Sequence, residues 1–165
     1  MSFRSARRSV LKRARKAAGS QRIDVPTSIR AKVGLADQDI FGHMTNTRYN
    51  AFALLAFEDL LIRSGANTAA TKAGATIKIL REDVVFVRML KFPDAFKVDM
   101  HLAEIKNDQL VFRHVFRKKD RLITTGAITA TIVGPDGERR AVRDILPDLK
   151  AGSDVASAPG AAAHS

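Results

Sequence analysis

The chain has 165 residues, of which 45% are hydrophobic and 27% are charged, and it contains no cysteine. This length and this hydrophobic fraction are typical of one folded domain, and they exclude a wholly disordered chain. The lack of cysteine excludes disulfides, thiolate nucleophiles and cysteine-based zinc sites. The longest stretch without a charged side chain, residues 122–135, is too short to cross a bilayer as a helix.

The formal net charge of +11 is concentrated near the N-terminus, where residues 1–22 hold eight basic side chains and no acid. The rest of the chain carries 20 basic and 17 acidic groups, so its net charge is only +3, and we expect no nucleic-acid partner. We interpret residues 1–22 as a basic leader that forms an amphipathic helix. Such a leader fits peripheral contact with an anionic membrane surface, a transit segment or a disordered arm, and we favour the first.

Residues 26–35 alternate apolar and polar side chains, which predicts a first strand. Its apolar face would hold Ile29, Ala31, Val33 and Leu35. A turn-like stretch follows at 36–45, and residues 46–64 then show apolar side chains at helical spacing. Thr45 or Asn46 can cap the start of this helix, and Gly65 can end it. The apolar positions of the predicted helix are Tyr49, Phe52, Ala53, Ala56, Phe57, Leu60 and Leu61.

The region from residue 75 to residue 133 reads as four consecutive strands, which gives the element order β-α-β-β-β-β. The first of these strands changes phase near Arg81–Asp83, which predicts a β-bulge. Residues 151–165 are mostly Ala, Gly and Ser, and we expect a disordered tail there. The predicted strands are 76–89, 96–104, 110–116 and 122–133, and turn residues separate them at 93–94, 107–108 and 118–120.

A dense group of polar residues lies between the first strand and the long helix. Asp39, Gly42, His43 and Asn46 fall within eight residues, directly before and at the predicted helix start. A helix N-terminus offers free N–H groups and the positive end of its dipole, which can stabilise a developing oxyanion. A carboxylate and an imidazole beside it can supply a base and an acid, so this segment is a candidate acyl-transfer site.

The pattern D-x-D-x-x-G-H-x-x-N-x-x-Y at residues 37–49, with the long helix and four strands behind it, resembles the hotdog-fold thioesterases. It is similar to the 4-hydroxybenzoyl-CoA thioesterase type, and its H-x-x-N portion also resembles the plant acyl-ACP thioesterases. The resemblance covers residues 26–145. It implies an α+β hotdog fold at residues 23–150, in which a five-stranded antiparallel sheet wraps around one long central helix.

The resemblance also implies roles for particular residues. Asp39 would be the catalytic base or nucleophile, and His43 and Asn46 would belong to the same catalytic group. Backbone amides near Asn46 and Thr47 would polarise the thioester carbonyl, and Tyr49 would lie beside the acyl pocket. The activity implied is hydrolysis of an acyl-CoA or acyl-carrier thioester.

The resemblance implies no metal and no redox cofactor, since coenzyme A enters only as part of the substrate. Because an open sheet exposes an edge, and because relatives pair their sheets edge to edge, we expect a homodimer or a homotetramer with the acyl pocket at the subunit interface. We expect a cytoplasmic protein, with peripheral membrane contact through residues 1–22.

Other interpretations remain open. A non-catalytic acyl-binding or scaffold protein is favoured by Phe41 and Leu54, which occupy positions where relatives carry an Asn or an acid. Asp37 fits a structural role, as a cap or a partner of a nearby base, and Asp39 itself could be a turn residue. A calcium loop is disfavoured, because Phe41 and Arg48 stand where it would need oxygen ligands.

Three further side chains have simpler interpretations. His114 is in phase with the apolar residues of its strand, so we expect a buried sheet histidine with its hydrogen bonds satisfied. His101 lies on the polar face of its strand, and we expect it to be solvated. Glu58 is expected on the solvent side of the long helix.

Overall fold

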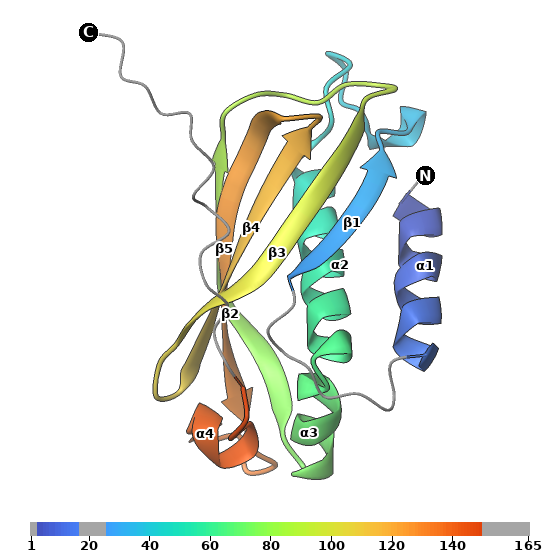
Figure 1. Cartoon of the computed structure of the whole chain (residues 1–165). Coiled ribbons are helices and arrows are strands. Elements are labelled where there is room, and N and C mark those ends of the chain that lie inside the picture. The colour runs from blue at the N-terminus through green and yellow to red at the C-terminus, as the bar shows by residue number, and fades with distance from the viewer. Residues whose placement is uncertain (1–2, 17–25, 150–165) are drawn as a thin grey trace, which may run out of the picture.

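The computed structural model describes residues 3–16 and 26–149, with only the backbone described for 11–16. Figure 1 shows one antiparallel sheet packed against a long helix, with a second helix beside it. The tail expected to be disordered at 151–165 and the rest of the leader, residues 1–2 and 17–22, lie outside the described residues.

The sheet has the strand order β1-β3-β4-β5-β2, so β2 forms one edge and β1 the other. The expected succession of strand, helix and four strands is therefore confirmed, and a two-residue strand, β6, additionally pairs with the end of β5. The strands are β1 (Thr27–Lys32), β2 (Thr76–Phe86), β3 (Ala95–Ile105), β4 (Gln109–Lys118), β5 (Arg121–Val133) and β6 (Arg139–Arg140).

The alternation along β2 breaks where its register against β5 shifts, between Ile79 and Arg81. This irregularity confirms the bulge predicted from the change of phase. Beyond the bulge, Glu82, Val84 and Phe86 pair with Ile128, Gly126 and Thr124, which puts them on the helix-facing side of the sheet. The bulge thus turns the acidic Glu82 toward the interior.

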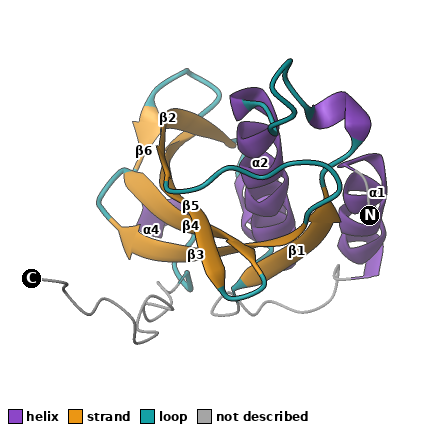
Figure 2. Cartoon of the chain, turned by 90° about the horizontal axis from the view of Figure 1, so that it is seen from above, coloured by secondary structure: helices purple, strands orange, loops and turns teal. Residues whose placement is uncertain are grey.

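The long helix α2 (Asn46–Arg63) fills the concave side of the sheet, which curves around it (Figure 2). Thr45 occupies the N-cap position, but its side chain makes no capping hydrogen bond to the helix backbone, and Gly65 follows the helix in the left-handed conformation at φ 70°. Edge-to-face aromatic pairs join α2 to the sheet, with ring centroids 4.9 Å apart for both Phe52–Phe96 and Phe57–Phe112. Glu58 is exposed, as expected.

The basic leader contains a helix, α1 (Phe3–Lys16), which packs on α2 and β1. Ala6 and Val10 are buried in this contact, and the ring of Phe3 meets that of Phe52 at 5.1 Å. The apolar stripe of the described part of α1 therefore faces the domain rather than solvent. Membrane contact through the leader stays a prediction.

Three short helices complete the described chain: η1 (Leu35–Asp37), α3 (Ala66–Lys72) and α4 (Val142–Ile145). None was expected from the sequence, because each is too short to show helical periodicity. Within the described residues, no helix combines the length and apolar character that crossing a membrane requires.

Two expectations about exposure were wrong. Leu35 does not extend the first strand: β1 ends at Lys32, and Leu35 is 71% exposed in η1. The chain turns because Gly34 donates its N–H to the carboxylate of Asp37 at 2.8 Å. His101 is not solvated but only 7% exposed, although its strand alternates as expected.

Candidate active site

Three loops meet at one end of the sheet, the upper end in Figure 1, together with the N-terminus of α2. They are residues 38–44, residues 87–94 and the β4–β5 hairpin. The first two are joined directly, because Met44 donates its N–H to the carbonyl of Leu90 at 2.7 Å and His43 forms an isolated bridge with Lys91. The candidate residues of the 37–49 motif therefore lie within a connected group of loops.

Asp39 holds a tight loop closed with its own carboxylate. Its Oδ1 accepts hydrogen bonds from the backbone N–H groups of Phe41 at 2.9 Å and His43 at 3.0 Å. The backbone N–H of Asp39 also donates to the carbonyl of His43 at 2.8 Å, and Gly42 supports the turn at φ 77°. Oδ2 makes no hydrogen bond within the described part of the chain, and the residue is exposed, so one carboxylate oxygen is fixed and the other faces outward.

Asp37 has the structural role expected of it. Asp37 is 5% exposed, and its carboxylate accepts the N–H of Gly34 and pairs with the guanidinium of Arg48, where Nε lies 2.9 Å from Oδ1. Its carbonyl accepts the N–H of Thr45 at 2.9 Å. Asp37 therefore ties the start of the loop to the first turn of α2.

The first turn of α2 presents free donors. The backbone N–H groups of Asn46 and Thr47 make no hydrogen bond to any described residue, and both side chains are exposed. The first backbone hydrogen bond of the helix runs from the N–H of Arg48 to the carbonyl of Thr45, at 2.9 Å. With no acidic side chain in this turn, the positive end of the helix is left for a ligand.

Tyr49 is buried in the core rather than open to the site. Its ring lies 5.1 Å from that of Phe86 and 5.5 Å from that of Phe116, and its hydroxyl oxygen accepts the N–H of Leu90 at 2.7 Å. Burial raises the pKa of the hydroxyl, although the Leu90 hydrogen bond acts against this. In this structure Tyr49 positions the 87–94 loop.

The structure thus brings Asp39, His43, Asn46 and Thr47 to one loop and helix start, and places Tyr49 beneath them. The link between Asp39 and His43 runs through the backbone. In the region that the structure describes, no hydrogen bond joins the His43 imidazole to the Asp39 carboxylate.

Sequence reasoning missed a group of buried polar side chains on the helix-facing side of the sheet. Glu82, His114 and Thr124 each bury polar atoms that have no hydrogen-bond partner among the described residues. His114 was expected to be buried and satisfied; it is buried, at 1% exposed, but neither ring nitrogen is bonded. A signal was present in Gly126, because a side chain there would overlap with the His114 ring.

A mostly apolar cavity of about 540 Å³ opens between α2 and β2. Leu54, Phe57 and Leu61 of the helix face Ile77 and Ile79 of the strand across it. Its volume is in the range of small-molecule sites, and its walls suit an acyl chain.

A family model described as the thioesterase-like superfamily matches residues 33–152, which include the loop, α2 and all strands after β1. The chain belongs to this superfamily. Thioester hydrolysis is the activity for which the superfamily is named. No curated protein sequence matches the chain significantly.

Several solved structures whose names describe thioesterases share the fold of this chain. The chain is similar to YbaW of Escherichia coli, named a probable thioesterase, at a TM-score of 0.68 and 17% identity over 72% of this chain and 95% of that one. It is similar to the DHNA-CoA thioesterase of Staphylococcus aureus at a TM-score of 0.65 and 17% identity, over 74% of this chain and 85% of that one. It is also similar to a 1,4-dihydroxy-2-naphthoyl-CoA thioesterase of Synechocystis, at a TM-score of 0.64 and 12% identity, over 76% of this chain and 98% of that one. These matches establish the hotdog fold.

Proposed function

We propose that the protein hydrolyses an acyl-CoA thioester to the free acid and coenzyme A, with Asp39 as the essential carboxylate. The observation that carries this proposal is the fixed carboxylate of Asp39, held by two backbone N–H groups beside the free amides of the first turn of α2. A base and an oxyanion site are the two parts that thioester hydrolysis needs.

In the proposed reaction, the N–H groups of Asn46 and Thr47 donate to the thioester carbonyl oxygen as negative charge develops on it. Asp39 removes a proton from water, and the water oxygen attacks the carbonyl carbon. The C–S bond then breaks and the thiolate leaves. Asp39 gives the proton that it took from water to this thiolate, which yields the free thiol. A thiolate is a good leaving group, so the proposed reaction uses no strong acid, metal or cofactor.

The same carboxylate could instead attack the carbonyl itself and form a mixed anhydride that water then cleaves. The two routes differ in where the oxygen of water first enters. In a single turnover in ¹⁸O-labelled water, general-base catalysis puts the label only in the product acid, whereas the anhydride route can put it in Asp39.

We further propose that the active form is a homodimer joined along β2. This edge strand and the residues after it expose large apolar side chains: Ile79 and Leu80 are each 41% exposed, Val85 is 61% exposed and Val87 is 47% exposed. An exposed apolar edge favours pairing with another strand, and a second copy of the chain offers an identical edge. Pairing there would place the partner subunit over the open side of the cavity between α2 and β2.

Asp39→Asn tests the proposed chemistry because it keeps the shape of the side chain and removes its basic oxygen. We expect kcat for a panel of short, long and aromatic acyl-CoAs to fall by about 10²- to 10⁴-fold, the usual range for loss of a general base. Release of free thiol is the measurement. The matched control is Asp148→Asn, an exposed aspartate at the other end of the molecule, which should change the rate less than about twofold.

Equal rates in wild type and Asp39→Asn would remove Asp39 from the mechanism. If wild type cleaves acyl-carrier thioesters and no acyl-CoA, the substrate class is wrong while the chemistry stands. If it binds acyl-CoA and cleaves neither, the non-catalytic acyl-binding alternative replaces hydrolysis.

A further inference from the structure

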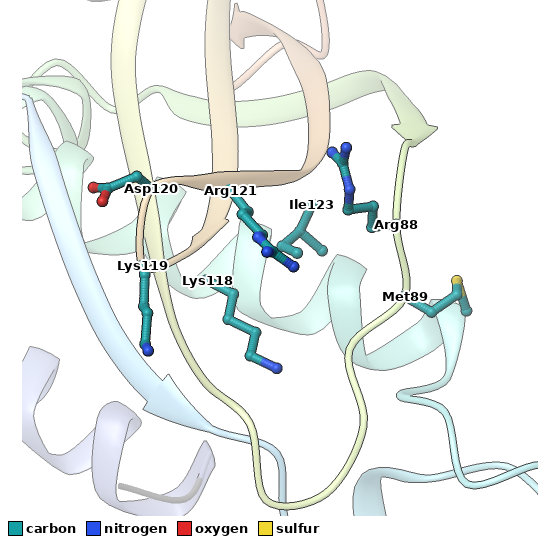
Figure 3. Close-up of a pocket in the computed structure, with 7 residues that line it drawn as sticks. All are labelled: Arg88, Met89, Lys118, Lys119, Asp120, Arg121 and Ile123. Atoms are coloured by element: carbon teal, nitrogen blue, oxygen red, sulfur yellow. The ribbon is translucent and has the colours of Figure 1, made fainter.

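A basic cavity of about 550 Å³ lies between the β4–β5 hairpin and the segment that follows β2. Four of its lining side chains are cations, namely Arg88, Lys118, Lys119 and Arg121, and the one acid among the lining residues is Asp120. Figure 3 shows Lys118 and Arg121 extending from the hairpin toward the segment after β2 that carries Arg88 and Met89. A concave site lined by charges of one sign concentrates its field on a small anion.

Two of the four cations are already engaged. Lys118 Nζ lies 2.6 Å from Oδ1 of Asp94, and Arg88 donates to a backbone carbonyl of β5 at 3.0 Å. The pKa of Asp94 lies below its usual value, because hydrogen bonds from Lys118 and from the Lys91 amide outweigh the opposing effect of burial. Asp94 is therefore ionised, and its negative charge compensates the positive charge of Lys118.

The other two cations, Lys119 and Arg121, are exposed and make no ion pair with any described residue. Lys119 lies at the turn of the hairpin and has a positive φ of 53°, a backbone conformation that allows the chain to reverse direction there. The cavity thus keeps at least two uncompensated cations. Groups of this kind bind phosphates by charge-assisted hydrogen bonds.

The cavity also offers an apolar surface. Two apolar side chains line it, Ile123, which is 2% exposed, and Met89, which is 43% exposed. A flexible, polarisable methionine side chain packs well against a flat ring. Cations beside such a surface suit a ligand that joins phosphates to a planar base.

One segment connects this cavity to the candidate active site. Val87 and Arg88 both donate their N–H groups to the carbonyl of Ile123, at 2.9 and 3.0 Å, on the side of the cavity. Two residues further on, the Leu90 carbonyl accepts the N–H of Met44 on the side of the Asp39 loop. A long ligand with its reacting group at Asp39 could therefore place its far end in the cavity.

We propose that this cavity binds the nucleotide phosphates of coenzyme A, with Lys119 and Arg121 as the principal contacts. The inference rests on the proposed function and makes it more specific, because it selects a coenzyme A thioester over a thioester on a carrier protein. A carrier protein lacks the nucleotide, and its acidic surface is convex, whereas the site here is concave and of small-molecule size.

Titration calorimetry of the full chain with adenosine 3′,5′-bisphosphate and with free coenzyme A tests this binding without any turnover. In the double variant Lys119→Gln/Arg121→Gln, we expect the Kd of both ligands to rise about tenfold or more, since two charge-assisted contacts are lost. The variant breaks no ion pair within the described residues, so the fold should be kept. Arg113→Gln, which removes an exposed cation from another part of β4, is the matched control and should leave both Kd values within about twofold.

A truncated substrate separates this inference from the proposed function. An acyl-N-acetylcysteamine thioester carries the reacting group without the nucleotide, so the double variant should hydrolyse it at the wild-type rate while its KM for acyl-CoA rises. Unchanged binding of both nucleotide ligands in the double variant would overturn the inference, even if thioesters are cleaved. Nucleotide binding that depends on Lys119 and Arg121 would support it, even if Asp39→Asn leaves hydrolysis unaffected.

Discussion

His114 is a buried titratable group on the inner face of β4. Its ring lies over Gly126 and 5.8 Å from the ring of Phe116, and neither nitrogen finds a partner among the described residues. Burial lowers the pKa of His114 from 6.5 to about 4, so the side chain is neutral at pH 7. A neutral imidazole that is buried without hydrogen bonds lowers the stability of the folded state. In this respect His114 differs from the apolar residues of the same strand face.

This pKa predicts how stability depends on pH. The unfolded chain takes up a proton near pH 6.5 while the folded chain resists until about 4, so stability is lost as the pH falls between these values. We expect the free energy of unfolding to drop by about 2 kcal/mol from this residue between pH 7 and pH 5. Urea unfolding of wild type and His114→Met at both pH values measures it.

The comparison isolates His114, because Glu82 and the surface carboxylates titrate in both proteins. The pH dependence of His114→Met should be weaker than that of wild type by the stated amount. Identical pH dependence in the two proteins would mean that His114 keeps an ordinary pKa in the folded state.

At the scale of elements, α1 and the start of α2 form one packed unit next to the candidate site. The guanidinium of Arg48 lies 5.6 Å above the ring centroid of Phe3 and also pairs with Asp37. Because Asp37 holds the beginning of the 38–44 loop, Arg48 links α1 to that loop. The match to the superfamily begins at residue 33, so α1 lies outside the matched residues.

Val10→Asp is expected to release α1 from the domain. Val10 is 1% exposed, and a carboxylate there would be buried without a partner. In hydrogen exchange, the amides of α1 should lose protection by at least about tenfold, while those of α2 between Phe52 and Leu61 stay protected. Arg7→Asp alters an exposed position of the same helix and should leave the protection of α1 nearly unchanged.

If both variants lose the same protection, α1 is held by charge rather than by its apolar stripe. If neither does, the contact with α2 contributes little to the stability of the helix. Either outcome would contradict the packing inferred from Phe3, Ala6 and Val10.

At the scale of the whole molecule, the two edges of the sheet differ. The β1 edge lies next to α1 and alternates buried and exposed side chains, whereas β2 exposes apolar side chains along much of its length. The loop at the candidate site adds Ile40 and Phe41, which are 93% and 76% exposed. Surfaces of this kind are typical of an interface between subunits.

Light scattering after size exclusion tests the proposed dimer. We expect a mass of at least twice the 18.0 kDa of one chain for wild type. Val85→Lys puts a charge on the apolar edge and should raise the dimer dissociation constant by about tenfold or more. Ser28→Lys, an exposed position on the β1 edge, is the control and should keep the wild-type mass. A wild-type mass of one chain would contradict the dimer.

Local chemistry in the sequence was enough to predict the order of strands and helix, the bulge near Arg81, the start of α2 and the structural role of Asp37. These depend on periodicity, turn residues and short hydrogen bonds, all of which act between near neighbours in the chain. The proposed roles of Asp39, His43, Asn46 and Thr47 also came from one continuous motif, and they await the experiments above.

Only the tertiary structure decided what distant segments do to one another. The sequence could not show that Arg88 joins Lys118, Lys119 and Arg121 around one cavity, because the two segments are about 30 residues apart and meet through strand pairing. Nor could it show that His101 is buried or that His114 lacks a partner, because burial depends on everything packed around a strand. Periodicity assigns a residue to a face, and the fold determines what covers that face.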